Sequence, residues 1–138
     1  MAESQMRQAV CRAIKCLDPV PVENSVGRSG TPDINFAEGW IELKEIDRWP
    51  SRDSTPLRVR PFTDAQRHWH RVRARHNGNT FVLVRVQRKD WILFDGKSAA
   101  EHLGNLTKEQ MRRHALRFWE GRLVVRELLN ALQAECRT

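Results

Sequence analysis

Residues 30–46, which constrain the fold more than any other segment, read GTPDINFAEGWIELKEI. Residues 33–36 and 40–46 are rich in apolar residues and are separated by Ala-Glu-Gly, so they predict two strands joined as a hairpin. Because side chains alternate along a strand, Glu42 and Lys44 lie on one face of the second strand and the intervening apolar residues lie on the other. The hairpin therefore places two opposite charges together on a sheet whose other face is apolar.

The segments around this hairpin predict a mixed α/β protein. We expect a helix over residues 2–16, whose apolar residues recur at helical spacing, and a short strand over 20–25. Thr63-Asp-Ala-Gln66 has the form of a capping box and predicts a helix that runs to about residue 76. Residues 80–86 are almost continuously apolar, as in a buried central strand, and residues 89–94 predict the neighbouring strand.

The last third of the chain predicts helices only. We expect a short helix near residues 98–103, a second from a capping box at Thr107 to Glu120, and a third over about 123–134. The whole order predicts an α/β sandwich with a central mixed sheet of four or five strands, flanking helices and extra C-terminal helices. At 138 residues we expect one domain, with a core over about 3–96 and a helical part over about 97–138.

The composition of the chain limits the kinds of partner that we expect for the protein. The formal charge is +7 and the pI is near 10.2, so the protein attracts polyanions. Charge alone leaves two possibilities open, because the protein could bind nucleic acid or have no acidic partner. The apolar runs are too short for a membrane span, and the first residues lack the apolar core of a signal peptide, so we expect a cytoplasmic protein with no membrane partner. Three cysteines without zinc-like spacing predict reduced thiols.

The hairpin carries a pattern suited to metal-dependent chemistry. Hydrolysis of a phosphodiester near neutral pH uses a hard cation that neutralises phosphate charge and acidifies bound water, and Mg²⁺ prefers one or two carboxylates with water. Asp33 and Glu42 lie across the predicted hairpin, so their carboxylates can meet at one end of the sheet. Lys44 can orient the attacking water or stabilise charge, and the backbone carbonyl of Leu43 is a further candidate metal ligand.

These residues resemble those of a known nuclease family. Pro32-Asp33 followed by Glu42-Leu43-Lys44 is similar to the motif of the PD-(D/E)xK nuclease superfamily. Within this superfamily, the chain is most similar to the virus-type replication-repair (VRR-NUC) branch. Three more residues carry this similarity, namely Gly30 before the proline, Gln66 at the start of the next helix and Gly78 before the apolar strand. The resemblance extends over roughly residues 3–86.

The resemblance implies a restriction-endonuclease-like sandwich with Mg²⁺ or Mn²⁺ as cofactor. It makes Asp33 and Glu42 metal ligands and adds Lys44, Gln66 and Glu3 to the catalytic centre, with Glu3 on the first helix facing the site. The implied substrate is structured or branched DNA, such as a junction or flap, that is cut during replication, recombination or repair, often by a homodimer. A phage or mobile-element origin follows only by analogy.

Each of these residues also has an ordinary structural interpretation. Asp33 after proline suits a turn, and Glu42 with Lys44 suits a solvated ion pair on a strand. Gln66 occupies the position where a capping box requires Gln or Glu for local reasons, and Glu3 suits the first turn of a helix because of the helix dipole. The combination of Asp33, Glu42 and Lys44 favours a site, whereas for Gln66 and Glu3 both interpretations stay open.

Basic residues follow the hairpin in two groups. Residues 47–62 predict a long functional or mobile loop, and residues 66–76 predict a helix with a basic face. The arginines that we expect to contact DNA phosphates are Arg48, Arg52, Arg58 and Arg60 in the loop and Arg67, Arg71 and Arg75 on the helix. The alternative is a solvated helix face. Trp49 in the loop is a candidate for base stacking, whereas the other tryptophans lie in apolar patterns typical of a core.

Two other functions stay open on the same sequence. A non-catalytic nucleic-acid-binding protein would keep the fold and charge, but the intact Asp33, Glu42 and Lys44 triplet favours catalysis. A restriction-type endonuclease would need a sequence-reading element, and the chain offers no separate candidate for one. We therefore predict a metal-dependent endonuclease that recognises the shape of DNA.

Overall fold

The computed structural model describes residues 2–22 and 30–136, with side chains over 5–22 and 30–133. In chain order the elements are α1 (Ala2–Ala13), the short 3-10 helix η1 (Lys15–Leu17), β1 (Val20–Pro21), β2 (Ile34–Phe36), β3 (Gly39–Ile46), α2 (Asp64–Arg75), β4 (Thr80–Val86), β5 (Asp90–Asp95), α3 (Gly96–His102), α4 (Lys108–His114), β6 (Arg117–Trp119) and α5 (Val125–Cys136).

The strands form one sheet in the order β1-β2-β3-β4-β5-β6. All neighbours are antiparallel except β3 and β4, which are parallel and are connected through the loop after β3 and the helix α2. The predicted hairpin is present, with Ile34 opposite Ile41, and the predicted central strand β4 pairs Val82 with Glu42 and Val84 with Lys44. This register puts the two charged residues in the middle of the sheet.

The structure confirms the α/β class and, over the described residues, corrects the number of strands in the sheet to six rather than four or five. The helix that begins at Thr107 ends at His114, well before Glu120, and residues 117–119 pair with β5. Leu116 N–H donates to the Leu93 carbonyl at 2.8 Å, and Trp119 is buried. These residues therefore pair with the free edge of β5 and do not continue the helix. The C-terminal part is therefore not purely helical.

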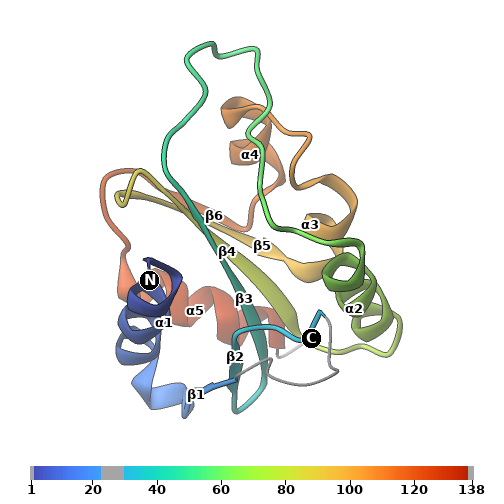
Figure 1. Cartoon of the computed structure of the whole chain (residues 1–138). Helices are drawn as coiled ribbons and strands as arrows, with labels where there is room; N and C mark the ends of the chain where they lie inside the picture. Colours follow the sequence, from blue (N-terminus) through green and yellow to red (C-terminus); the bar gives the residue numbers. More distant parts are fainter. Residues whose placement is uncertain (1, 23–29, 137–138) are drawn as a thin grey trace.

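Two apolar clusters cover the two faces of the sheet. The first contains Ile41 and Leu43 of β3 together with buried residues of α1 and α5. The second contains Val82 and Val84 of β4 together with residues of the loop after β3, α3 and α4. Figure 1 shows α1 and α5 on one side of the sheet and α2, α3 and α4 on the other. Glu42 and Lys44 face the second side, toward α2.

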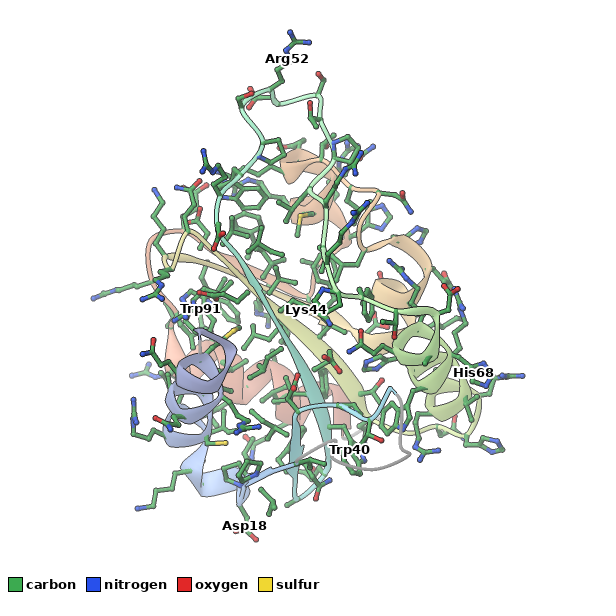
Figure 2. The ribbon with its side chains drawn as sticks, viewed as in Figure 1. Asp18, Trp40, Lys44, Arg52, His68 and Trp91 are labelled. Carbon is green, nitrogen blue, oxygen red and sulfur yellow. The ribbon has the colours of Figure 1, made fainter. Side chains whose placement is uncertain are left out.

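The long loop over residues 47–62 projects from the body and is packed at its base. Leu57, Val59 and Phe62 are buried in the second cluster, and Leu57 N–H donates to the Leu106 carbonyl at 2.8 Å. Arg52 lies at the far tip (Figure 2). Among the described residues, no helix combines the length and the apolar character needed to cross a membrane.

Candidate active site

Asp33 is anchored to β3 by its own side chain. It lies one residue before β2, and its Oδ2 accepts the Leu43 N–H at 2.8 Å. In a strand, the N–H and the carbonyl of one residue point to the same side. The Leu43 carbonyl therefore points to the same edge of β3 as the Asp33 carboxylate, as the predicted ligand set requires.

Glu42 is a buried carboxylate with an incomplete set of partners. Its exposed fraction is 3%, its Oε2 accepts from Gln66 Nε2 at 3.4 Å, and among the described residues its buried Oε1 has no hydrogen-bond donor. Burial raises the pKa of Glu42 well above its usual value, and the charge of Asp33 raises it further, whereas Lys44 lowers it. A cation between the two carboxylates would relieve both effects.

Lys44 lies beside Glu42, as strand alternation predicted. Its exposed fraction is 2%, and its Nζ lies 3.3 Å from Glu42 Oε2. The ammonium also donates to Gln66 Oε1 at 3.1 Å and to the Pro61 carbonyl, and it lies 5.2 Å from the centroid of the Phe62 ring. The loop after β3 therefore helps to hold the ammonium in place.

Gln66 has both of the roles that the sequence left open. Its backbone N–H donates to Thr63 Oγ1 and its Oε1 accepts the Thr63 N–H, which completes the predicted capping box. The same side chain reaches Glu42 and Lys44. The first turn of α2 is thus fastened directly to the charged residues of β3.

Gly30 allows the first turn of α2 to lie against the segment that carries Asp33. Its φ is +90°, and a Cβ at this position would lie 2.4 Å from the Ala65 carbonyl oxygen. Such a distance is shorter than any ordinary contact, so a side chain here would push α2 away from the segment. Close packing against α2 therefore requires glycine at this position of the predicted motif.

The donors at this site fit a hard divalent cation. Asp33, Glu42 and the Leu43 carbonyl supply oxygen atoms only, and Mg²⁺ prefers one or two carboxylates with water completing its shell. Within the part of the chain that the structure describes, no group of three or more His, Cys, Asp or Glu side chains is placed to hold a metal. Glu3 lies in the first turn of α1, and its side chain is outside the described residues.

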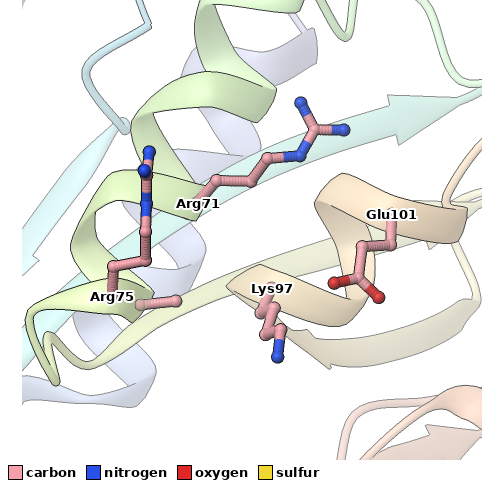
Figure 3. A pocket seen from close by; sticks show the side chains of 5 residues that line it. Arg71, Arg75, Lys97 and Glu101 are labelled. Atoms are coloured by element: carbon pink, nitrogen blue, oxygen red, sulfur yellow. The ribbon is translucent and has the colours of Figure 1, made fainter.

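The predicted DNA-binding arginines are spread over several surfaces. Arg58, Arg60 and Arg67 line a hollow of about 530 Å³ between the loop and the turn after α3. Arg71 and Arg75 line a second hollow of about 450 Å³ between α2 and α3, together with Lys97 and Glu101 (Figure 3). Arg48 lies at the base of the loop and Arg52 at its tip.

Part of the basic face of α2 packs against the protein itself. The Arg67 guanidinium donates to the carbonyls of Ala100 at 3.0 Å and Leu103 at 2.7 Å, and Arg71 donates to the Ala100 carbonyl at 3.1 Å. These bonds satisfy carbonyls toward the C-terminal end of α3. The solvated-face alternative is therefore wrong for Arg67, which has a structural role that helical spacing did not reveal.

Trp49 does not offer a free ring for base stacking. Its Nε1–H donates to Asp90 at 2.8 Å, its ring stacks on Phe118 with centroids 6.1 Å apart, and Lys108 lies 4.8 Å from the ring centroid. The stacking hypothesis is therefore wrong for this structure, because protein groups already contact the ring. Trp49 fastens the base of the loop to the sheet.

Three further neighbours of these sites were not predicted from the sequence. The Pro61 carbonyl and the Phe62 ring hold Lys44, and Lys97 joins Arg71 and Arg75 at the second hollow. The first two lie in a loop without periodicity, and the third is brought in by packing of α3 on α2. Such contacts have no local sequence signal.

No protein-family model and no curated protein matches the chain. The resemblance to PD-(D/E)xK nucleases therefore stays a prediction. Its support comes from the residues of the site, which the fold gathers around Glu42.

Proposed function

We propose that this protein is a Mg²⁺-dependent DNA endonuclease that hydrolyses phosphodiester bonds at the site formed by Asp33, Glu42 and Lys44. The observation that carries the proposal is the buried Oε1 of Glu42, which has no hydrogen-bond donor among the described residues and belongs to a carboxylate next to that of Asp33. An unsatisfied buried carboxylate oxygen is costly, and a bound cation is the simplest group that would satisfy it. Its neighbour Asp33 supplies a second carboxylate, and Lys44 supplies a fixed positive charge.

Each residue has a distinct role in the proposed reaction. Asp33, Glu42 and the Leu43 carbonyl would hold the cation, which would acidify water and neutralise phosphate charge. Asp33 also fixes the edge of β3 through the Leu43 N–H. Lys44, held by Gln66 and the Pro61 carbonyl, would provide positive charge for the phosphate and, on releasing one of these partners, would orient the attacking water. Gln66 positions both Glu42 and Lys44.

The substrate part of the proposal rests on the family resemblance and on charge. We propose branched or structured DNA, such as a junction or flap, and a homodimer as the acting form. The formal charge of +7 and the exposed arginines of the loop support contact with a polyanion. Manganese would replace magnesium as a hard, oxygen-preferring cation.

The proposal is tested by cleavage of a panel of DNA substrates. Four-way junction, flap, nicked and linear DNA of matched length are incubated with the protein and Mg²⁺, and in parallel with EDTA. We expect strand cleavage with Mg²⁺ or Mn²⁺, faster on branched than on linear DNA, and none with EDTA. Binding without cleavage of any substrate would favour the non-catalytic alternative, and equal cleavage with EDTA would contradict the metal site.

A further inference from the structure

A pocket next to the candidate active site is built from cations. The hollow between the loop and the turn after α3 is lined by Arg58, Arg60 and Arg67, with the polar side chains Thr55 and Asn105 at its rim. Among the described residues, no Asp or Glu lines it, and none of the three arginines forms an ion pair. We call this hollow the three-arginine pocket.

Arg67 is a preorganised cation in the lining of this pocket. Its guanidinium is held by the carbonyls of Ala100 and Leu103 and lies 4.4 Å from the centroid of the Phe62 ring. Burial lowers the pKa of Arg67, and the charge of Arg71 lowers it further, whereas Asp64 opposes this. A half-buried guanidinium that forms no ion pair with the described residues would gain from an anionic ligand.

The three-arginine pocket lies close enough to the candidate active site to contact the same nucleic-acid strand. Lys44 and Arg67 both contact the ring of Phe62, whose centroid lies 5.2 Å from Lys44 Nζ and 4.4 Å from Arg67 Cζ. Along a duplex strand the phosphates follow at about 3.4 Å of helix axis each. Arg67 lines the pocket together with Arg58 and Arg60, so we expect a strand whose phosphate lies at Lys44 to continue toward this pocket.

We infer that the three-arginine pocket binds a backbone phosphate of the same DNA strand that occupies the Asp33, Glu42 and Lys44 site. This inference rests on the proposed function for the identity of the strand, but the pocket itself needs no metal. Guanidinium groups bind phosphate through paired N–H donors, and the Thr55 hydroxyl and Asn105 amide add neutral donors. A second fixed phosphate would hold the strand in register for cleavage.

The test measures binding of a fluorescein-labelled single-stranded oligonucleotide by anisotropy, in EDTA and at several salt concentrations. The pocket variant is Arg58→Gln/Arg60→Gln, because both residues are exposed and Arg67 also supports α3. The matched control is Arg122→Gln/Arg126→Gln, which removes the same charge from two exposed positions, one three residues before α5 and one in its first turn. Thermal unfolding checks that both variants fold like the wild type.

We expect the pocket variant to bind about tenfold more weakly than the control, with a log K against log salt slope shallower by about one. Oligonucleotides with one linkage at a time made neutral by methylphosphonate should lose affinity at one or two adjacent positions. That position-dependent loss should be present in the wild type and the control and missing in the pocket variant.

Three results would overturn the inference. Equal weakening of the two double variants would mean that only total charge matters. A position-dependent loss that persists in the pocket variant would place the phosphate contact elsewhere. The pocket variant could also lose binding of inorganic phosphate while it binds the oligonucleotide as well as the wild type does. That result would indicate a site for a free small anion. Because these measurements use EDTA, failure to cleave with Mg²⁺ would contradict the proposed function and leave this test unaffected.

Discussion

His70 is a titratable side chain enclosed by apolar and aromatic groups. It lies on α2 one turn after Gln66, is fully buried, and has neither ring nitrogen hydrogen bonded within the described structure. Burial, and then the charge of Lys44, lowers the pKa of His70 to about 4. The imidazole is therefore neutral at physiological pH, and it packs against the edges of Phe62 and Trp69.

This depressed pKa predicts a loss of stability in acid. Between the unfolded pKa near 6.5 and the folded pKa of about 4, the unfolded chain binds more protons, so the free energy of unfolding falls as pH falls through this window. From about pH 7.5 to pH 5 we expect His70 to contribute a loss of about 2 kcal/mol. Urea unfolding measures the free energy of unfolding at both pH values. The decrease between pH 7.5 and pH 5 should be smaller by this amount in His70→Leu than in the wild type. An unchanged difference would contradict a buried neutral imidazole.

The chemistry of β3 could be predicted at the residue scale because strand alternation is a strict rule. Glu42 and Lys44 were predicted to share a face, and the ion pair between them confirms it. The Pro61 carbonyl and the isolation of His70 could not be predicted, since both depend on contacts between segments far apart in the sequence. A histidine in a helix pattern has no signature of burial.

The contact between α2 and the segment before β2 is the element-scale feature that assembles the site. Gly30 lies against the backbone of Ala65, and Gln66 follows directly with its bonds to Glu42 and Lys44. A displacement of this helix end by a few tenths of an ångström would alter both bonds. The position of α2 is therefore linked to the electrostatics of the site.

A pair of glycine substitutions tests this contact. Gly30 and Gly121 both have positive φ, +90° and +84°, but a Cβ at Gly30 meets Ala65 whereas one at Gly121 meets no atom within 4 Å. Gly121→Ala should cost about 1 kcal/mol of stability, from backbone strain alone. Gly30→Ala should cost about 2–4 kcal/mol by thermal unfolding, because the steric overlap adds to that strain. Equal losses for the two variants would show that close packing at Gly30 is unimportant.

Local signals decided which elements could be predicted. The capping boxes at Thr63 and Thr107 are present as predicted, because they depend only on residues four positions or fewer apart. The buried strand β4 was predicted with its bounds. The strand β6 was not, because three residues are too few for a periodic pattern and their conformation comes from pairing with β5.

At the scale of the whole molecule, the helices α1 and α5 and the candidate active site lie on opposite faces of the sheet. α1 and α5 cover one face of the sheet with an apolar cluster, whereas the other face carries Glu42, Lys44, α2 and the projecting loop. The exposed arginines of that loop lie beyond the candidate active site, where a long polyanion can reach them. The net charge of the chain predicted a polyanionic partner, but the two hollows that concentrate this charge depend on tertiary packing.

The proposed nuclease activity depends on Glu42 as a metal ligand, and a pair of carboxylate variants tests that role. Glu45 lies three residues away on the opposite face of the same strand and pairs with Arg85 at 2.7 Å, so Glu45→Gln is the matched control for Glu42→Gln. Both variants lose one carboxylate from β3, and removal of a buried carboxylate with a raised pKa should leave Glu42→Gln folded.

The measurement is the single-turnover rate of cleavage of a four-way junction in Mg²⁺ by the wild type and both variants. We predict that Glu42→Gln cleaves about a thousandfold more slowly or not at all, because loss of a metal ligand removes several kcal/mol of transition-state stabilisation. Glu45→Gln should cleave at a rate close to that of the wild type. Undiminished cleavage by a folded Glu42→Gln protein, or equal losses in the two variants, would contradict the claim.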